Sequence, residues 1–428
     1  MLGWSFLKLI NSSNFFIDKL LSFVIFSAFL GQAFSYSKVY LFHIVVLFVF
    51  LILLLRKELD VFLKFDFKKH LIFCYLLIWS FASAVLSPDK TLALKGLFYI
   101  LCGVGILLAW NLIQDKSFIY KGLFYLYLAN LVLGLLEAFT PIRWPISCAS
   151  PWLELFKKEN FGDYPLTYQD YPTGFFWHPN NASLIVLLGY PIILNSKKIK
   201  STFKILITSL GLIFIAKAGA KAILILSAIY LSYYILTKNI LFRLKSAKSY
   251  LMLALILSLF ITVFYSFNNE QRNEFLTSLE VVTNYGKSII TLVTRGHADG
   301  VRGEVSERIR FMIGAVDLIR ENLFFGIGIN QNANLLVDVL GTPTSLKSIH
   351  NYWIELLLTG GLILFVPVFS WLLFKLMVLM RRMETRALGE TLGLFILGVV
   401  AMSSAAYFLP QWILYAIISD SENARDFL

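Results

Sequence analysis

Two polar residues, His350 and Asn351, stand directly before a long apolar run in the segment SIHNYWIELLLTGG. Histidine is the side chain best suited to accept a proton near neutral pH, so His350 is a candidate general base. Asn351 has the simpler role of a helix cap, because the first backbone N–H groups of a helix lack partners, and it is also a candidate substrate contact. Glu355 follows about one turn inside the run, where a carboxylate is costly unless it is paired or functional. The segment therefore predicts a helix start that presents a base, with Glu355 placed to orient a basic partner or to contact substrate.

Two lysines, Lys217 and Lys221, form a second group of candidates in the segment FIAKAGAKAILIL. Their spacing of four places them on one face of a helix, or at the two ends of a tight turn through Gly219. Cations this close repel one another unless an anion lies between them. Snorkelling of a long stem toward water accounts for either lysine alone, but less well for the pair. We therefore predict an anion site at these lysines.

Two arginines, Arg308 and Arg310, lie in the segment SERIRFMIGAVDLIRENLFFGIG, which is predicted to be helical from Ser306 to about Asn322. Its apolar stripe consists of Ile309, Met312, Ile313, Val316 and Ile319. Arg308 falls at the edge of this stripe, where it either snorkels or binds phosphate through its planar guanidinium. Arg310 falls on the polar face beside Asp317, which favours an ion pair or solvation, and it remains a candidate substrate contact.

A fourth segment, YPTGFFWHPNNASLIVLL, carries His178 and the aromatic Trp177. Pro179 restrains the turn, and either Asn180 or Asn181 is predicted to cap the helix that follows. Trp177 suits the membrane interface, where its ring can also stack on a sugar. A structural role is favoured over binding here, and Trp177, His178 and Asn180 are retained as candidate substrate contacts.

Metal and nucleotide chemistry have little support in the sequence. The three cysteines, Cys74, Cys102 and Cys148, are scattered without metal-binding spacing, so neither a zinc site nor a disulfide framework is expected. Gly326 and Gly328 form a Gly-x-Gly pair, which is a weak phosphate signal without a preceding strand. We expect no metal and no cofactor.

The elements that must position these residues are membrane helices. The 428 residues are 58% hydrophobic and only 15% charged, with a mean hydropathy of +0.73. Apolar runs of about 20 residues, the length needed to cross a bilayer, recur along the chain. Although the net charge is +12, the basic residues concentrate in short loops between these runs, which argues against nucleic-acid binding. The sequence thus predicts an all-α, polytopic membrane protein.

About twelve transmembrane helices are predicted, with no cleavable signal peptide before them. Their limits are 19–35, 38–55, 70–86, 92–113, 122–140, 181–195, 205–218, 220–237, 249–267, 351–374, 388–406 and 408–420. Alternate loops are basic, which places both termini in the cytoplasm and the candidate residues on the extracytoplasmic side. The resulting organisation is helices at 1–140, an outer loop at 141–180, helices at 181–267 with the lysine turn, a large and partly helical outer loop at 268–350, and helices at 351–428.

These four segments, in the order in which they occur along the chain, resemble the O-antigen ligase and O-antigen polymerase superfamily, whose shared region is called the Wzy_C domain. The resemblance is carried by TGFFWHPNNAS, GAKAILIL, SERIRFMIGAVDLIRENLFFGIG and IHNYWIELLLTGGLI, and it is strongest over about 170–370. It implies an all-helical, metal-independent glycosyltransferase of type C. The donor would be a glycan on undecaprenyl diphosphate, and the acceptor a second glycan or lipid A–core.

The resemblance also assigns roles to individual residues. His350 matches the essential histidine of the family, and Arg308 matches an arginine that opens the helix before ENLFFGIG. A second family arginine has Lys221 in its place, and lysine holds phosphate as a point charge without the bidentate fork. Lys217 is then a candidate for the second phosphate contact. The three catalytic candidates are therefore His350, Arg308 and Lys221.

Two other functions compete with glycan transfer by a polymerase, which we favour slightly over a ligase. A lipid-glycan transporter or flippase also suits about twelve helices, but transporters place their polar residues near mid-membrane, whereas these candidates lie at helix ends. The second competing function is that of a scaffold subunit in an envelope complex. Expected partners are the lipid-linked donor, the acceptor, membrane lipids of the bacterial inner membrane, and a chain-length regulator or flippase of the same pathway.

Overall fold

Helices make up the structure, as the composition predicts. The computed structural model describes residues 13–30, 34–36, 39–55, 70–142, 171–176, 178–237, 314–332, 351–401 and 408–420. Within these ranges, extended structure is confined to a two-residue antiparallel pair, β1 (Ser35–Tyr36) and β2 (Val39–Tyr40). The predicted residues His350, Arg308, Arg310 and Trp177 and the predicted span 249–267 lie outside the described residues.

Each predicted span that falls on described residues coincides with a helix, although the ends differ by several residues. The helices are α2 (Ser13–Leu30), α3 (Leu41–Leu55), α4 (Leu71–Leu86), α5 (Lys90–Leu112), α6 (Ser117–Phe139), α8 (Pro179–Asn195), α9 (Ser201–Lys217), α10 (Lys221–Thr237), α15 (Tyr352–Arg381), α16 (Arg386–Gly398) and α17 (Leu409–Ser419), with a short 3-10 turn, η5 (Val399–Ala401), after α16.

Among the described residues, three helices are long and apolar enough to cross a membrane: α5, α6 and α15. Helices α3, α4, α10 and α17 are apolar but shorter. A helix of 11 residues such as α17 reaches only about 16 Å, roughly half of the hydrocarbon thickness. The chain is therefore membrane-embedded, and the count of twelve crossings stays a prediction.

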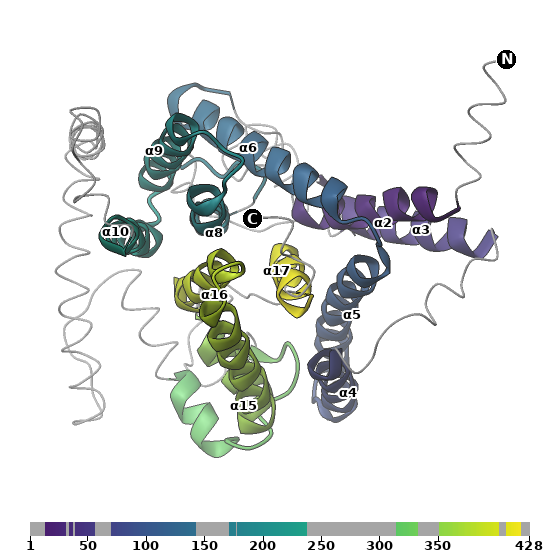
Figure 1. The fold of residues 1–428 in the computed structure, drawn as a ribbon. Helices are drawn as coiled ribbons and strands as arrows, with labels where there is room; N and C mark the ends of the chain where they lie inside the picture. Colours follow the sequence, from purple (N-terminus) through teal and green to yellow (C-terminus); the bar gives the residue numbers. More distant parts are fainter. Residues whose placement is uncertain are drawn as a thin grey trace, which may run out of the picture.

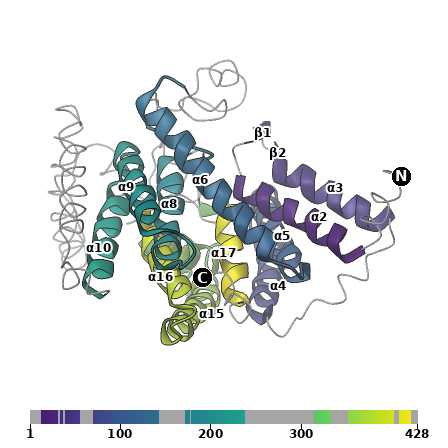
Figure 2. The same ribbon diagram turned by 45° about the horizontal axis from the view of Figure 1, so that its top comes forward.

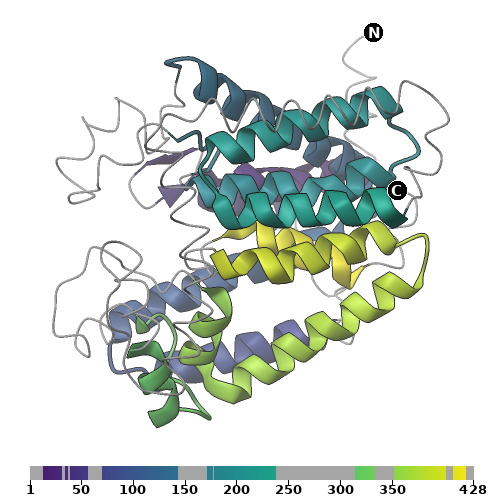
Figure 3. The same ribbon diagram turned by 90° about the vertical axis from the view of Figure 1, so that its left-hand side faces the viewer.

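Helix α16 lies at the centre of one half of the bundle, between α8 and α15, with α10 and α17 to either side of it (Figure 1). Helices α2, α3 and α5 gather on the side away from α9 and α10, and α6 runs from this group to α9 (Figure 2). The long axes of most helices run roughly side by side across the view of Figure 3, which is the arrangement of a helical bundle. The elements that carry the candidate residues, α8, α10 and α15, all adjoin α16 or its immediate neighbours.

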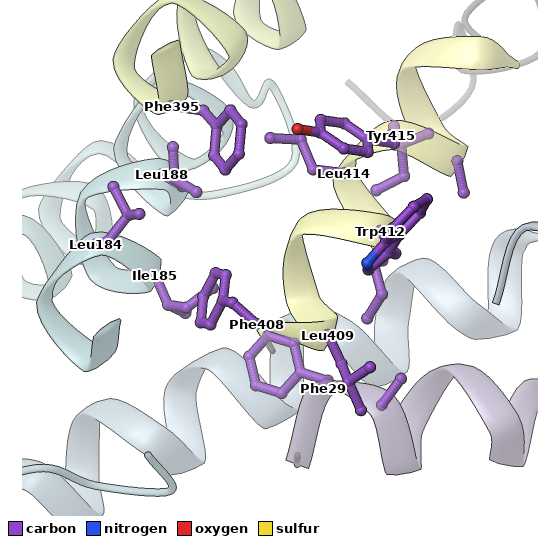
Figure 4. Packing of buried hydrophobic residues seen from close by; sticks show 14 of the residues in the cluster. Phe29, Leu184, Ile185, Leu188, Phe395, Phe408, Leu409, Trp412, Leu414 and Tyr415 are labelled. Atoms are coloured by element: carbon purple, nitrogen blue, oxygen red, sulfur yellow. The ribbon is translucent and has the colours of Figure 1, made fainter. Parts of the chain in front are cut away.

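The core is built from aromatic and branched side chains around α17 (Figure 4). The ring of Phe176 lies 6.2 Å from that of Phe29 and 5.8 Å from that of Phe408, measured between ring centres. Trp412 packs against Gly103 of α5 so closely that a Cβ there would lie 2.1 Å from the indole. Close helix packing at small residues is typical of membrane bundles, where hydrocarbon gives little hydrophobic drive to association.

One end of α16 is anchored by a buried carboxylate, Glu390, which is 8% exposed. It accepts hydrogen bonds from the hydroxyl of Tyr230 at 2.8 Å and from the amide of Asn195 at 3.1 Å. Arg386 pairs with the same carboxylate at 3.3 Å and donates to the hydroxyl of Tyr233 at 2.7 Å. Because each charge finds partners, the cluster ties α8, α10 and α16 together without leaving a buried carboxylate uncompensated.

Candidate functional site

The lysine pair occupies a turn between two helices, which decides between the two arrangements that the spacing allowed. Helix α9 ends at Lys217 and α10 begins at Lys221. The chain reverses at Gly219, whose φ of +65° lies in the left-handed region that favours glycine. The amide of Lys221 donates to the carbonyl of Gly219 at 2.9 Å. Both lysines are partly buried, so this turn gathers two cations at one end of the bundle.

The two lysines differ in their electrostatic surroundings. Lys217 lies in the last turn of α9, at the negative end of the helix dipole, and its Nζ is 5.7 Å from the centre of the Phe139 ring. Lys221 is the first residue of α10, at the positive end of that helix, where a cation is unfavourable and an anion is stabilised. The end of α9 therefore stabilises the charge of Lys217, and the start of α10 at Lys221 favours an anion at the turn.

Helix α15 is two helices joined at a break, whereas the sequence predicted one span. Gly361 has φ 58° and ψ −163°, a conformation that is essentially restricted to glycine. The ring of Trp353, before the break, lies 5.2 Å from that of Phe369, after it. In a straight helix these residues would be about 24 Å apart along the axis. The first half therefore folds back along the second, and the apolar run 362–381, about 30 Å long, matches one bilayer crossing by itself.

The Gly-x-Gly segment, which sequence analysis treated as a weak phosphate signal, holds this break in place. The amides of Ile327 and Gly328 donate to the carbonyls of Leu358 and Thr359, at 2.9 and 3.1 Å. A Cβ on Gly326 would lie 2.5 Å from the carbonyl oxygen of Thr359. The glycines thus let one backbone approach another, which satisfies the peptide groups that the break leaves open.

Asn351 and Glu355 lie on the first half of α15. The side-chain oxygen of Asn351 accepts from the amides of Trp353 and Ile354, at 3.1 and 3.2 Å, which confirms the predicted helix cap. The carboxylate of Glu355 accepts a hydrogen bond from the side-chain amide nitrogen of Asn332 at 3.3 Å. The side-chain oxygen of Asn332 accepts one from the Thr359 hydroxyl at 3.2 Å. Asn332, which joins Glu355 to the Gly-x-Gly segment, was not predicted from the sequence.

The predicted cap of α8, Asn180 or Asn181, is wrong by two or three residues. The helix begins at Pro179, and the cap is His178, whose Nδ1 accepts from the amide of Asn180 at 3.2 Å. Proline suits the first helical position, because its missing N–H would have no partner there, and this moves the start of the helix toward His178. One ring nitrogen of His178 is therefore used in holding the helix start.

The apolar stripe predicted for the helix before the Gly-x-Gly segment differs from the buried face of its described part, residues 314–321. Val316 belongs to the predicted stripe but is 37% exposed, while Ala315 and Leu318 are buried. Apolar spacing does not distinguish a side chain that faces protein from one that faces lipid, since both surroundings are apolar. Asp317 pairs with Arg320 at 3.5 Å on the exposed face.

The starts of three helices meet around the last turn of α16. The indole of Trp353, near the start of α15, donates to the carbonyl of Ile396 at 3.0 Å. A Cβ on Gly398 would lie 2.5 Å from Leu184 of α8 and 3.6 Å from Ile223, the third residue of α10. The structure thus brings Asn351, His178 and Lys221 to the same end of α16, where three positive helix ends favour an anion.

Comparison with known proteins identifies the region that holds these features. No curated protein matches the chain. A family model does match, over residues 204–369, which contain the lysine turn, the Gly-x-Gly segment, the first half of α15 with its break, and the start of the second half. The TGFFWHPNNAS segment lies before the matched residues. In agreement with the sequence motifs, residues 204–369 match the model of the Wzy_C family, which is described as O-antigen ligase.

Proposed function

We propose that the chain transfers a glycan from an undecaprenyl diphosphate carrier to a hydroxyl acceptor at the outer face of the bacterial inner membrane, as an O-antigen polymerase. The observation that carries this proposal is the meeting of three helix starts and the lysine turn at one end of α16. Such a site suits a diphosphate on a lipid, because it gathers positive charge at the end of a bundle of apolar helices. The Wzy_C match supports glycan transfer as the reaction.

The proposed mechanism is inverting and needs no metal. Lys221, with Lys217 and Arg308, holds the diphosphate and stabilises the negative charge that grows on this leaving group. His350 removes the proton of the acceptor hydroxyl, which attacks the anomeric carbon from the face opposite the diphosphate. The remaining candidate substrate contacts are Asn351, Glu355, His178, Asn180, Trp177 and Arg310. We also propose that the chain crosses the membrane twelve times, that it has a type C glycosyltransferase fold, and that both termini lie in the cytoplasm.

The test is transfer by the purified protein alone, given a synthetic repeat unit on undecaprenyl diphosphate. Products are sized by gel and mass spectrometry. A ladder of joined repeat units with release of the lipid diphosphate is the expected result. A protein that moves the lipid-linked glycan across a vesicle membrane without joining units would instead be a transporter.

An O-antigen ligase is the second candidate, and it is favoured by the match to a family described as O-antigen ligase. The two activities leave different lipopolysaccharide in a deletion strain. Loss of a polymerase leaves core capped with single repeat units, whereas loss of a ligase leaves bare core and polymer stranded on its lipid carrier. A lipopolysaccharide gel of the deletion strain therefore chooses between them.

Lys221→Ala is expected to lower kcat/KM for the lipid diphosphate about 10- to 100-fold, since a hydrogen bond to a charged group contributes about 1.5–3 kcal/mol. Lys221→Arg restores the guanidinium that the family carries at this place, and it is expected to retain transfer. The matched control is Lys197→Ala, an exposed lysine in the loop between α8 and α9, beyond the opposite end of α9 from the turn. Equal losses for Lys197→Ala and Lys221→Ala would contradict an anion site at the turn.

A further inference from the structure

A buried carboxyl group, Glu137, lies in the last turn of α6 beside the candidate site. Its side chain is 0% exposed, although it belongs to an apolar helix where a carboxylate is costly unless it is bonded. Its Oε2 accepts from the amides of Thr173 and Gly174, at 2.8 Å each. Short bonds from two N–H groups to one carboxyl oxygen fix the position of the backbone that donates them.

Asn130, seven residues earlier on the same face of α6, extends this arrangement. It is 0% exposed, and its side-chain oxygen accepts from the amide of Phe175 at 2.9 Å. Three consecutive backbone amides, those of Thr173, Gly174 and Phe175, are therefore bound by two side chains of one helix. Gly174 has φ +56°, and a Cβ there would lie 2.4 Å from the Asn130 oxygen, so the fit depends on glycine.

The clamped loop, residues 171–176, supports the lysine turn at its upstream end. Tyr171 packs against Gly219, where an added Cβ would lie 2.6 Å from the tyrosine ring. At its downstream end, Phe176 is buried and packs between Phe29 and Phe408. The loop therefore joins a fixed core to the turn that separates Lys217 from Lys221.

Helix α6 reaches the lysine turn by a second route. Phe139, two residues after Glu137, is the ring that lies 5.7 Å from the Lys217 Nζ. Helix α9 packs on α6 at Gly134, where an added Cβ would lie 2.2 Å from the ring of Phe214. The position of the turn thus depends on the end of α6 both directly and through the clamped loop.

We propose that Glu137 is a positioning residue for glycan transfer: by clamping residues 171–176 it holds Tyr171 against Gly219, and so sets the lysine turn in the geometry that receives the lipid diphosphate. This inference rests on the proposed function. Glu137 contacts neither the donor nor the reacting atoms, and it acts through the turn. Its loss should therefore weaken donor binding more than it slows the chemical step.

The test compares Glu137→Leu with Glu137→Gln. Leucine leaves two buried amides without an acceptor, whereas glutamine keeps a carbonyl oxygen that accepts from both. The matched control is Asp18→Leu, because Asp18 likewise accepts from two consecutive amides, those of Gln114 and Asp115, at 3.1 Å each, but in the loop between α5 and α6. Tyr171→Leu removes the ring that rests on Gly219 and leaves the clamp intact, so it tests the same link should Glu137→Leu fail to fold.

Two readouts are combined, hydrogen exchange and donor kinetics. In Glu137→Leu, exchange is expected to rise in the peptide 171–176 and also in 216–222, with a rise of about tenfold in KM for the lipid diphosphate and a kcat within about threefold of wild type. Tyr171→Leu is expected to show the same KM rise, and the double variant no further rise, because the two residues act in series. Glu137→Gln is expected to behave as wild type in both readouts.

The inference is overturned if exchange rises in 171–176 while 216–222 and KM stay unchanged, or if Asp18→Leu raises KM equally. Failure of the proposed function has a different signature, since wild-type protein would then transfer no glycan. In that case the exchange of 216–222 in Glu137→Leu still decides whether Glu137 positions the lysine turn.

Discussion

His350→Ala is expected to abolish glycan transfer while the protein still folds and inserts. A positioned general base contributes about 10²- to 10⁴-fold to the rate of proton transfer, so turnover should fall by that factor. The helix start itself should survive, because the cap of α15 comes from Asn351, whose oxygen binds the amides of Trp353 and Ile354. The measurement is turnover with synthetic lipid-linked donor, beside the unfolding temperature in detergent.

The control for this variant is a histidine elsewhere in the bundle, His43 of α3, whose Nδ1 accepts from the amide of Tyr40 at 3.2 Å. His43→Ala is expected to lower stability without a comparable loss of turnover. The acidic limb of the pH–rate profile is the second readout, since protonation of the base stops catalysis in wild type. Product at the wild-type rate from His350→Ala would refute the mechanism.

Much of the helical architecture was predictable because one physical signal dominates it. The hydrocarbon core of a membrane requires apolar helices whose backbone groups are hydrogen-bonded within the helix. An apolar run of sufficient length therefore predicts a helix, whatever that helix packs against in the fold. The cap at Asn351 was predictable for a similarly local reason, since an asparagine before an apolar run has few other roles. The turn at Lys217 and Lys221 was left open by spacing alone, and Gly219 decides it.

The features that were missed depend on contacts between distant segments. The apolar pattern continues through Gly361, so nothing in its periodicity signals a break, and the bonds that stabilise the break come from residues about 35 positions earlier, such as Phe324 and Gly328. The pair Gly360–Gly361, together with Gly326-x-Gly328, was the available signal. Glu137 and Glu390 were also recognisable in the sequence as unusual residues, because a carboxylate within an apolar helix is rare and is usually bonded or functional.

The break in α15 and the clamp on residues 171–176 position different parts of the candidate site. The Gly-x-Gly segment sets the direction of the half-helix that follows His350, and α6 sets the turn that holds Lys221. The start of α15 and the start of α10 both contact the last turn of α16, the first through Trp353 and the second through Ile223. A substitution far from any reacting atom should therefore impair transfer when it moves one of these helix starts relative to the other.

Gly361→Ala is expected to cause the second large loss, by removing the break in α15. An alanine at φ 58° and ψ −163° is strained by about 1–3 kcal/mol, and its Cβ would lie 2.3 Å from the carbonyl oxygen of Phe324. Either the helix straightens or the Gly-x-Gly segment detaches, and both displace the half-helix that follows His350. Unfolding temperature should fall by several degrees and transfer should be lost.

The matched control is Gly393→Ala in α16, where the nearest atom to an added Cβ is 3.7 Å away, at ordinary contact distance. Alanine should be neutral or slightly stabilising there, because glycine within a helix costs about 0.5–1 kcal/mol. The break itself is tested with cysteines in place of Trp353 and Phe369, whose rings are 5.2 Å apart. A short bifunctional reagent should join them in the parent protein and fail in Gly361→Ala, since a straight helix separates these positions by about 24 Å. Efficient joining in both proteins, or in neither, would show that Gly361 does not make the break.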